Sequence, residues 1–291
     1  MFKGSIVALI TPFNQGNVDY SALQNIVEWH IKQGTNAIIP VGTTGESPTL
    51  THDEHVDVVR CVAEQVNGRI PVIAGAGSNN PIEAIALTQR SEAAGADATL
   101  HVAGYYNRPN QQGLLAHFTA VHNASTKPII LYNIPPRAVV NILPETMAQL
   151  AKLPRIAGVK DATGDLSRPW IERQLIKKED FCWLSGEDAT AVAYNISGGQ
   201  GCISVTANIA PALCAQMQQA CLNGEWQKAV DIQDRLMPLH QAMFAEPSPA
   251  GAKYAASLLN LCAADCRLPV MPLSDATKQQ IEKAMRDLEL I

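Results

Sequence analysis

A lysine ends an apolar run in the segment RIAGVKDATG, residues 155–164. Lysine is rarely buried without a partner, so Lys160 either extends its ammonium group to water or uses its amine for chemistry. A neutral amine forms a Schiff base with a carbonyl substrate, and apolar surroundings are a common way to keep a lysine neutral. Three apolar neighbours in sequence favour such surroundings: Ile156, Ala157 and Val159. The alternative is a lysine that caps the strand and pairs with Asp161 or another nearby acid.

Other polar side chains follow apolar runs in the same way. In chain order they are Thr43, Thr44, Glu46, Ser47, Tyr105, Tyr106, Asn107, Arg108, Tyr132, Asn133, Arg137, Glu187, Asp188, Ser204 and Thr206. Histidine does not occur at these positions, and His101 lies inside a run, which argues against a hydrolytic triad built on histidine. The arginines leave a small anionic substrate possible.

Eight short apolar segments predict the strands that must position these side chains. They begin at Ser5, Ala37, Ile70, Ala96, Pro128, Ile156, Phe181 and Gly201. Unbroken apolar runs of this length are typical of strands buried on both faces of a parallel sheet. Helical patterns separate the runs, and one begins with the capping box Thr51-x-x-Glu54. The alternation predicts an α/β fold, a (β/α)8 TIM barrel; a doubly wound open sheet is the alternative.

The strand signal ends near Gly224, and three helical patterns follow. We therefore expect a barrel catalytic domain over residues 1–224 and a small C-terminal helical domain over residues 225–291. No low-complexity linker separates them, so the helices should pack on the barrel. Catalytic side chains of such barrels lie at the carboxyl ends of the strands and in the loops that follow. The polar residues named above would then meet at one mouth.

The composition argues against several classes of function. Of 291 residues, 47% are hydrophobic and 17% charged, and the net charge of −5 comes without a basic cluster, so we expect no nucleic-acid partner. No apolar run approaches the roughly 20 residues that span a bilayer, and the N-terminus does not resemble a signal peptide. Seven cysteines without a Cys-x-x-Cys pair favour reduced thiols and a cytoplasmic location. His52 and His55 have no evident third ligand, so we expect no metal.

Six motifs resemble those of the dihydrodipicolinate synthases, also called 4-hydroxy-tetrahydrodipicolinate synthases. They are GTTGES from Gly42, YYNRP from Tyr105, YNIPPR from Tyr132, GVKDATG from Gly158, LSGEDA from Leu184 and GGQGCISVTAN from Gly198. The family belongs to the pyruvate-dependent class I aldolases, with N-acetylneuraminate lyase. The resemblance covers nearly the whole chain. It implies a lyase that condenses pyruvate with L-aspartate 4-semialdehyde to 4-hydroxy-tetrahydrodipicolinate in lysine (diaminopimelate) biosynthesis, without a cofactor.

The resemblance also implies catalytic roles. Lys160 would form the imine with pyruvate, and Thr43 and Thr44 would hold the pyruvate carboxylate. Tyr132 would relay protons during imine formation, linked through Thr44 to Tyr106. In the family this last tyrosine reaches into the site of a neighbouring subunit, which implies a homo-oligomer, as a dimer or as a homotetramer made of two tight dimers.

The resemblance implies a further set of residues for the second substrate and the pocket around it. Arg137 would bind the carboxylate of aspartate semialdehyde, because a planar guanidinium binds carboxylates in a bidentate manner. Gly186 and Ile203 would line the pocket, chiefly through backbone groups. Two departures from the family pattern affect this region. Gly104 replaces a proline, which would loosen the loop before the tyrosine pair, and Pro136-Arg137-Ala138-Val139 replaces the usual Ser-Arg-Thr-Gly.

A regulatory site is also implied. The matching positions, at which lysine-inhibited members bind L-lysine at the tight dimer interface, are Ser47, Pro48, His52, His55, Asn79, Glu83 and Tyr105. A cationic ligand needs an acid, which Glu83 supplies, while the histidines and Asn79 could contact its other end. We therefore expect feedback inhibition by L-lysine; the alternative is an ordinary polar interface.

Two other functions stay open. A sister aldolase, such as N-acetylneuraminate lyase or a 2-keto-3-deoxy sugar acid lyase, shares the imine lysine but must accommodate a polyhydroxylated chain. Arg137, the GTTGE motif and the lysine-pocket residues favour the synthase. A non-catalytic barrel that senses lysine or another metabolite would form no adduct with pyruvate that borohydride can trap.

Overall fold

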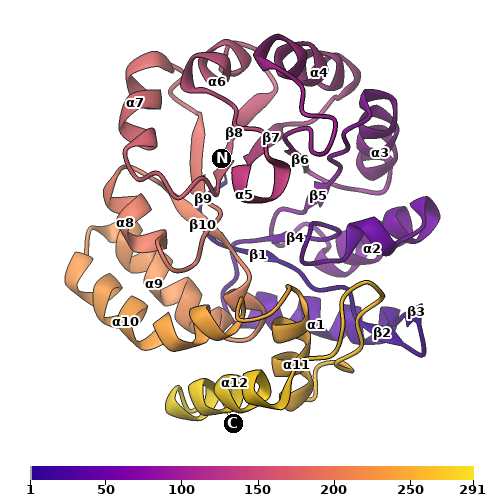
Figure 1. Cartoon of the computed structure of the whole chain (residues 1–291), viewed down its shortest axis with the longest axis vertical. Coiled ribbons are helices and arrows are strands. Elements are labelled where there is room, and N and C mark those ends of the chain that lie inside the picture. The colour runs from indigo at the N-terminus through magenta and orange to yellow at the C-terminus, as the bar shows by residue number, and fades with distance from the viewer. Residues whose placement is uncertain (1) are drawn as a thin grey trace.

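The chain folds into a closed barrel of eight parallel strands, seen in a computed structural model that describes residues 2–291. The strands are β1 (Gly4–Ala8), β4 (Ala37–Ile39), β5 (Ile73–Gly75), β6 (Ala98–Val102), β7 (Ile129–Asn133), β8 (Ile156–Asp161), β9 (Cys182–Ser185) and β10 (Gly201–Ser204). Their order is β4-β1-β10-β9-β8-β7-β6-β5, and a parallel bridge from Ile38 to Val72 closes the ring beside β5 (Figure 1). Each strand coincides with one of the eight apolar segments. The predicted TIM barrel is therefore confirmed, and the open sheet is wrong.

A ring of eight helices surrounds the barrel, one after each strand (Figure 1). They are α1 (Tyr20–Lys32), α2 (His52–Val66), α3 (Pro81–Ala93), α4 (Gln111–Ala124), α6 (Pro144–Ala151), α7 (Arg168–Leu175), α8 (Ala191–Ile196) and α9 (Pro211–Asn223). The predicted capping box is present: the Thr51 side chain accepts a hydrogen bond from the Glu54 N–H group, and the Glu54 carboxylate accepts one from the Thr51 N–H group. Within residues 2–291, none of the helices is long and apolar enough to cross a bilayer.

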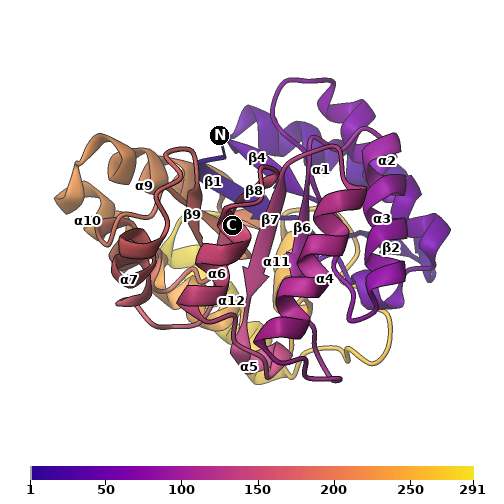
Figure 2. The ribbon, with the colours of Figure 1, turned by 90° about the horizontal axis from the view of Figure 1, so that it is seen from above.

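Short elements follow four of the barrel strands. The loop after β7 forms α5 (Pro135–Ala138), which lies where the β7 arrow ends (Figure 2). Two single 3-10 turns follow other strands, η1 (Ser47–Thr49) after β4 and η2 (Thr206–Asn208) after β10. A small antiparallel hairpin, β2 (Phe13–Asn14) with β3 (Asn17–Val18), follows β1. The sequence patterns did not predict this hairpin, because two-residue strands are too short to show a period.

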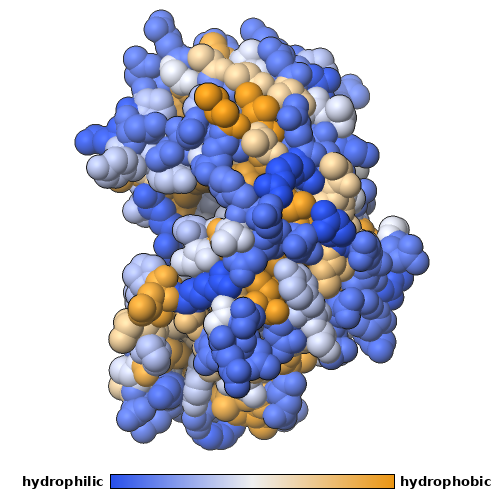
Figure 3. All heavy atoms as spheres, turned by 90° about the vertical axis from the view of Figure 1, so that its right-hand side faces the viewer, coloured by the Kyte–Doolittle hydropathy of each residue, from blue (hydrophilic) through white to orange (hydrophobic). Residues whose placement is uncertain are grey.

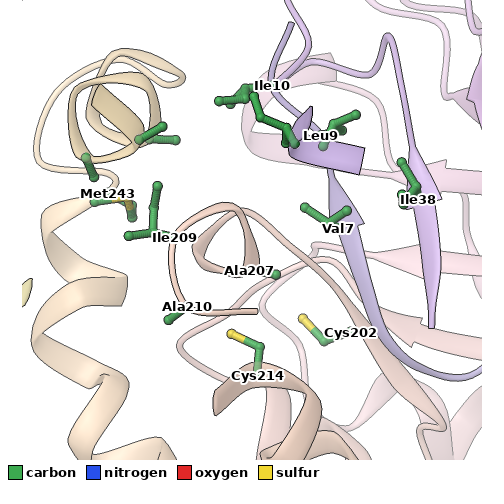
Figure 4. Packing of buried hydrophobic residues seen from close by; sticks show 14 of the residues in the cluster. Val7, Leu9, Ile10, Ile38, Cys202, Ala207, Ile209, Ala210, Cys214 and Met243 are labelled. Atoms are coloured by element: carbon green, nitrogen blue, oxygen red, sulfur yellow. The ribbon is translucent and has the colours of Figure 1, made fainter. Parts of the chain in front are cut away.

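Three further helices, α10 (Trp226–Ala242), α11 (Ala250–Leu258) and α12 (Asp275–Asp287), form the C-terminal region. They share one hydrophobic cluster with the barrel: Met243, just after α10, packs near Ile209, and the cluster continues to Leu9 and Val7 of the β1 region (Figure 4). The helices thus pack on the barrel as expected. The division of the chain at residue 224 stays a prediction, because the apolar core runs across it.

The outer face of α2 and α3 is largely hydrophilic, with separate apolar patches (Figure 3). Their apolar residues turn inward: Val56, Val59 and Val62 of α2 are buried. The exposed apolar side chains include Ile82 at the start of α3 and Tyr106 in the loop after β6.

Candidate active site

A cavity of about 470 Å³ lies at the carboxyl ends of the strands. Most of the predicted site residues line it, from strands, helices and loops of five successive strand–helix units. They are Thr43, Thr44, Ser47, Pro48, His52, His55, Glu83, Tyr105, Tyr132, Arg137 and Lys160. The residues predicted to be catalytic and those predicted to bind lysine therefore line the same cavity.

Lys160 lies near the end of β8 and is only 7% exposed. In the sheet it pairs with Tyr132 of β7 on one side and Leu184 of β9 on the other. Its Nζ atom lies 4.1 Å from the centroid of the Tyr132 ring. Gly186 lies next to the Lys160 side chain: a Cβ atom at position 186 would be 3.1 Å from Cε of Lys160. The lysine thus points into the barrel mouth, and the absence of a side chain at Gly186 leaves it room.

The apolar surroundings of Lys160 differ from those expected. Ile156 and Val159 belong to the cluster between the strands and the outer helices, so that part of the prediction was wrong. Successive side chains of a strand point to opposite faces, and a register shift in the β7–β8 pairing turns Ile156 outward as well. The inward neighbours are the barrel-lining residues, which include Leu184 and Ile203.

The alternative partner of Lys160, Asp161, faces away from it. The Asp161 carboxylate accepts a hydrogen bond of 2.9 Å from the Thr163 N–H group and lies 3.8 Å from Nε of the buried Arg168. Over residues 2–291, no carboxylate lies within 4.0 Å of the Lys160 nitrogen, whereas Arg168 has both Asp161 and Glu172 as ion-pair partners. A lysine that merely caps the strand and pairs with Asp161 is therefore not what the chain contains.

The loop Gly42–Ser47 after β4 carries both threonines. Thr44 is buried and Thr43 is exposed toward the cavity that both line. The preceding Val41 is buried with φ of 50°, in a left-handed region that β-branched residues rarely adopt. Gly75 of β5 permits this approach, because a Cβ atom there would lie 2.3 Å from the Val41 carbonyl oxygen. The loop conformation is thus set by close backbone packing.

Several predicted residues lie outside the cavity of one chain. Tyr106 is 89% exposed with φ of 67°, and its side chain projects from the surface. Asn79 donates a hydrogen bond of 3.2 Å from Nδ2 to the Tyr105 carbonyl oxygen, and Ile203 is buried in the barrel interior. Across the described residues, no hydrogen bond joins the hydroxyl groups of Thr44, Tyr132 and Tyr106. The tyrosine–threonine relay therefore stays a prediction.

Other polar residues expected at the mouth serve the scaffold. The Ser204 hydroxyl donates to the Asp188 carboxylate, and the Thr206 hydroxyl lies 2.8 Å from Nδ1 of His240. Glu46 turns away from the cavity and lies 2.5 Å from the nitrogen of Lys253. Their position after a strand was a correct observation, but only the closed barrel shows which side they face.

The loop after β6 makes several contacts around Gly104. A Cβ atom at Gly104 would lie 3.0 Å from Pro109, so the proline ring occupies the space beside the glycine. Asn107 donates to the Asn79 carbonyl oxygen at 3.0 Å, while the Asn79 side chain donates back to Tyr105. These contacts limit the freedom of the loop, and the predicted loosening at Gly104 stays a prediction.

The residues predicted to bind lysine include an acid, Glu83, at one corner of the cavity. Glu83 accepts a hydrogen bond from the Ser78 hydroxyl and lies 2.9 Å from Nε2 of His52. The Ser78 hydrogen bond, followed by His52, lowers the pKa of Glu83, so its carboxylate is charged. Burial lowers the pKa of His55 to about 4, so this imidazole is neutral at physiological pH. The corner offers the charged carboxylate of Glu83 and the neutral imidazole of His55, which suit an ammonium ligand.

All seven cysteines are free thiols, five of them buried. Among residues 2–291, no three His, Cys, Asp or Glu side chains gather into a group that could hold a metal ion.

Comparison with known proteins decides the family. A model of the dihydrodipicolinate synthetase family matches residues 1–288. The chain belongs to the dihydrodipicolinate synthetase family. The resemblance carried by the six motifs is thereby confirmed at the level of the family.

Members of the dihydrodipicolinate synthetase family share the full length of the chain. The 4-hydroxy-tetrahydrodipicolinate synthase of Parvibaculum lavamentivorans is 58% identical over 291 residues, 100% of both chains. The chloride-inhibited dihydrodipicolinate synthase of Acinetobacter baumannii, solved in complex with pyruvate, is 40% identical with a TM-score of 0.97 over 100% of both chains. The enzyme of Cyanidioschyzon merolae with lysine bound is 38% identical, with a TM-score of 0.96 over 100% of this chain and 99% of that one.

Proposed function

We propose that the chain is a 4-hydroxy-tetrahydrodipicolinate synthase that condenses pyruvate with L-aspartate 4-semialdehyde in lysine biosynthesis. One observation carries the proposal: the amine of Lys160 is buried at the barrel mouth beside Tyr132, and none of the carboxylates of residues 2–291 lies within 4.0 Å of it. An amine in such a place is suited to attack a carbonyl carbon. The relative solved with pyruvate and those named as synthases support pyruvate as the carbonyl substrate.

The first half-reaction activates pyruvate. Nζ of Lys160 attacks C2 of pyruvate, and loss of water leaves an imine. The imine withdraws electrons, so a proton leaves C3 and an enamine forms. We assign the pyruvate carboxylate to Thr43 and Thr44, whose loop lies across the cavity from Lys160. We assign proton transfer to Tyr132, because its ring is in contact with the amine.

The second half-reaction joins the two substrates. The enamine C3 attacks the aldehyde carbon and forms the new carbon–carbon bond. The amino group of the product then attacks C2, which closes the ring and releases the Lys160 amine. We assign the carboxylate of aspartate semialdehyde to Arg137, which is exposed at the mouth on α5. Burial, followed by the neighbouring Asp188, raises the pKa of Glu187, an acid in the loop after β9.

We propose that the active unit is a homo-oligomer. Tyr106 is nearly fully exposed and held in a left-handed conformation by its loop, so it is available to a second copy of the chain. A dimer would complete the relay that one chain leaves open. Analytical ultracentrifugation of the wild type and of Tyr106→Ala tests this: we expect an assembled Tyr106→Ala protein with reduced kcat, and a fully active monomer would contradict it.

We further propose inhibition by L-lysine at the corner that contains Glu83. A charged carboxylate beside neutral His55 fits the ammonium and amino-acid groups of lysine, and a relative of known structure binds lysine. The sister sugar-acid lyases have no specific observation in their favour. A cytoplasmic location is a proposal as well, supported by seven free thiols.

The decisive experiment is borohydride trapping with pyruvate, followed by peptide mass spectrometry. We expect one adduct, on Lys160, and none in Lys160→Met. A parallel assay compares condensation of pyruvate with aspartate semialdehyde against cleavage of N-acetylneuraminate and 2-keto-3-deoxy sugar acids. Adduct formation with cleavage only would favour a sister lyase, and no adduct at all would favour a sensor.

A further inference from the structure

The loop with Thr43 and Thr44 is fastened to the C-terminal helices by a buried ion pair. Oε1 of Glu46 lies 2.5 Å from Nζ of Lys253, which is on α11. The Glu46 side chain is 3% exposed and that of Lys253 is 0% exposed. The second carboxylate oxygen of Glu46 accepts a hydrogen bond of 2.8 Å from the Arg267 N–H group. Both oxygens are thus held by the last quarter of the chain.

Two further contacts hold the side chain of Lys253 in this position. Its nitrogen donates a hydrogen bond of 2.7 Å to the Asp265 carbonyl oxygen and lies 3.8 Å from the centroid of the Phe13 ring. The rest of the buried face of α11 is alanine and glycine, so the lysine is the one charged group on it. A buried ion pair is a poor source of stability, because desolvation offsets most of the attraction. Its benefit must therefore lie in fixing a geometry.

The loop needs such a fixed point. Glu46 has φ of 55°, and Val41 at the other end has φ of 50°, so residues in the left-handed region bracket the two threonines. This conformation is unfavourable for residues with a side chain and persists only when the surroundings enforce it. At the Val41 end, backbone packing does so, because a Cβ atom on Gly45 would lie 2.9 Å from the Val41 nitrogen. At the Glu46 end, the side-chain contact to Lys253 does so.

We infer that Glu46 and Lys253 are positioning residues, which hold the Thr43–Thr44 loop in the shape that receives the carboxylate of the keto acid. Neither residue lines the cavity, so both act through the loop. The inference rests on the proposed function, since it assigns the keto-acid carboxylate to this loop. It gives the C-terminal helices a part in substrate binding, although they contribute no residue to the cavity wall.

The test measures the pyruvate concentration at which half of the protein is trapped by borohydride on Lys160. For Lys253→Met we expect this concentration to rise about tenfold or more, since misplaced positioning groups cost up to about 10²-fold. The KM for aspartate semialdehyde should change far less, because Arg137 lies on another loop. If the single variant does not fold, the double variant Glu46→Gln/Lys253→Met decides, because it leaves no unpaired buried charge.

Ile281→Ala is the control for general damage to the C-terminal helices. Ile281 is fully buried on α12, and no hydrogen bond or ion pair links it to Glu46. We expect this variant to lose thermal stability but to keep the wild-type response to pyruvate. A wild-type response in both the Lys253→Met and the double variant, or an equal shift in Ile281→Ala, would overturn the inference alone. Failure of the wild type to form any adduct would overturn the proposed function and the inference with it.

Discussion

The amine of Lys160 and the ring of Tyr132 are neighbours because their strands pair in register. Nζ of Lys160 lies 4.1 Å from the ring centroid, and the two residues are direct partners in the β7–β8 ladder. Hydrogen bonds of the sheet, not a flexible loop, therefore set their distance. If they act as the proposed nucleophile and proton-transfer group, they need no rearrangement before reaction.

The hydroxyl group of Tyr132 is the first point to test. Tyr132→Phe keeps the ring over Lys160 but removes the acidic hydrogen, so we expect kcat to fall about 10²- to 10⁴-fold, the usual range for loss of a general acid or base. The adduct with pyruvate should still form on Lys160, but more slowly. Stopped-flow trapping and steady-state assays measure the two effects, and activity within twofold of the wild type would contradict the proton-transfer role.

Arg137 should discriminate between the two substrates. Arg137→Lys keeps the charge but loses the planar fork, so we expect the KM for aspartate semialdehyde to rise about tenfold, the effect of one lost charge-assisted contact. The pyruvate concentration for half-maximal trapping should stay unchanged. Arg235→Lys, on the exposed face of α10, is the matched control. An equal rise for both substrates would show that Arg137 maintains the mouth in general and does not select the aldehyde.

Inhibition by lysine should depend on the charge of Glu83. Glu83→Gln keeps the size of the side chain but removes the negative partner of the ligand's ammonium group. We expect the lysine concentration for half-inhibition to rise about tenfold or more, as for other charge-assisted contacts. Glu145→Gln, exposed on α6, should behave like the wild type. The proposal fails if millimolar lysine does not inhibit the assembled wild type.

Two buried histidines predict a loss of stability in acid. Burial lowers the pKa of His30 and of His101 to about 3 in the folded chain. The unfolded chain protonates histidine near pH 6.5, so it binds more protons between pH 6.5 and 3, and stability falls as the pH falls through this window. Each such group contributes about 1.4 kcal/mol per pH unit to the slope near pH 5. Urea unfolding at several pH values measures the slope, and His30→Asn should reduce it by about 1.4 kcal/mol per pH unit; an unchanged slope would contradict this assignment.

Val139 should be a site of stored strain. It is exposed, with φ of 61°, where a β-branched residue is unfavourable. Val139→Gly removes this backbone strain but makes the unfolded chain more flexible. We therefore expect the free energy of unfolding to rise by about 0.5–1 kcal/mol. Val230→Gly, in the middle of α10, should instead lose about 1 kcal/mol. Thermal unfolding of both variants gives the sign, and a loss in Val139→Gly would show that the valine contributes packing.

The sequence by itself determined the eight strands and the candidate nucleophile. Apolar runs bounded by glycine, proline and polar residues mark buried strands, because backbone periodicity and desolvation act over a few neighbouring residues. A lysine within such a run is conspicuous for the same reason, and this signal pointed to Lys160. The same signal is present at Lys253, in the apolar stretch AGAKYAAS.

Only the tertiary structure decided what each of these lysines faces. Lys160 meets a tyrosine ring and open space, whereas Lys253 meets the carboxylate of Glu46, a residue from the opposite end of the chain. Ile156 and Val159, adjacent to Lys160 in sequence, turned out to face the outer helices. The neighbouring residues in the sequence indicate that a charge is buried. Its partner comes from a distant part of the chain, and only closure of the barrel and packing of α11 against it place that partner beside the charge.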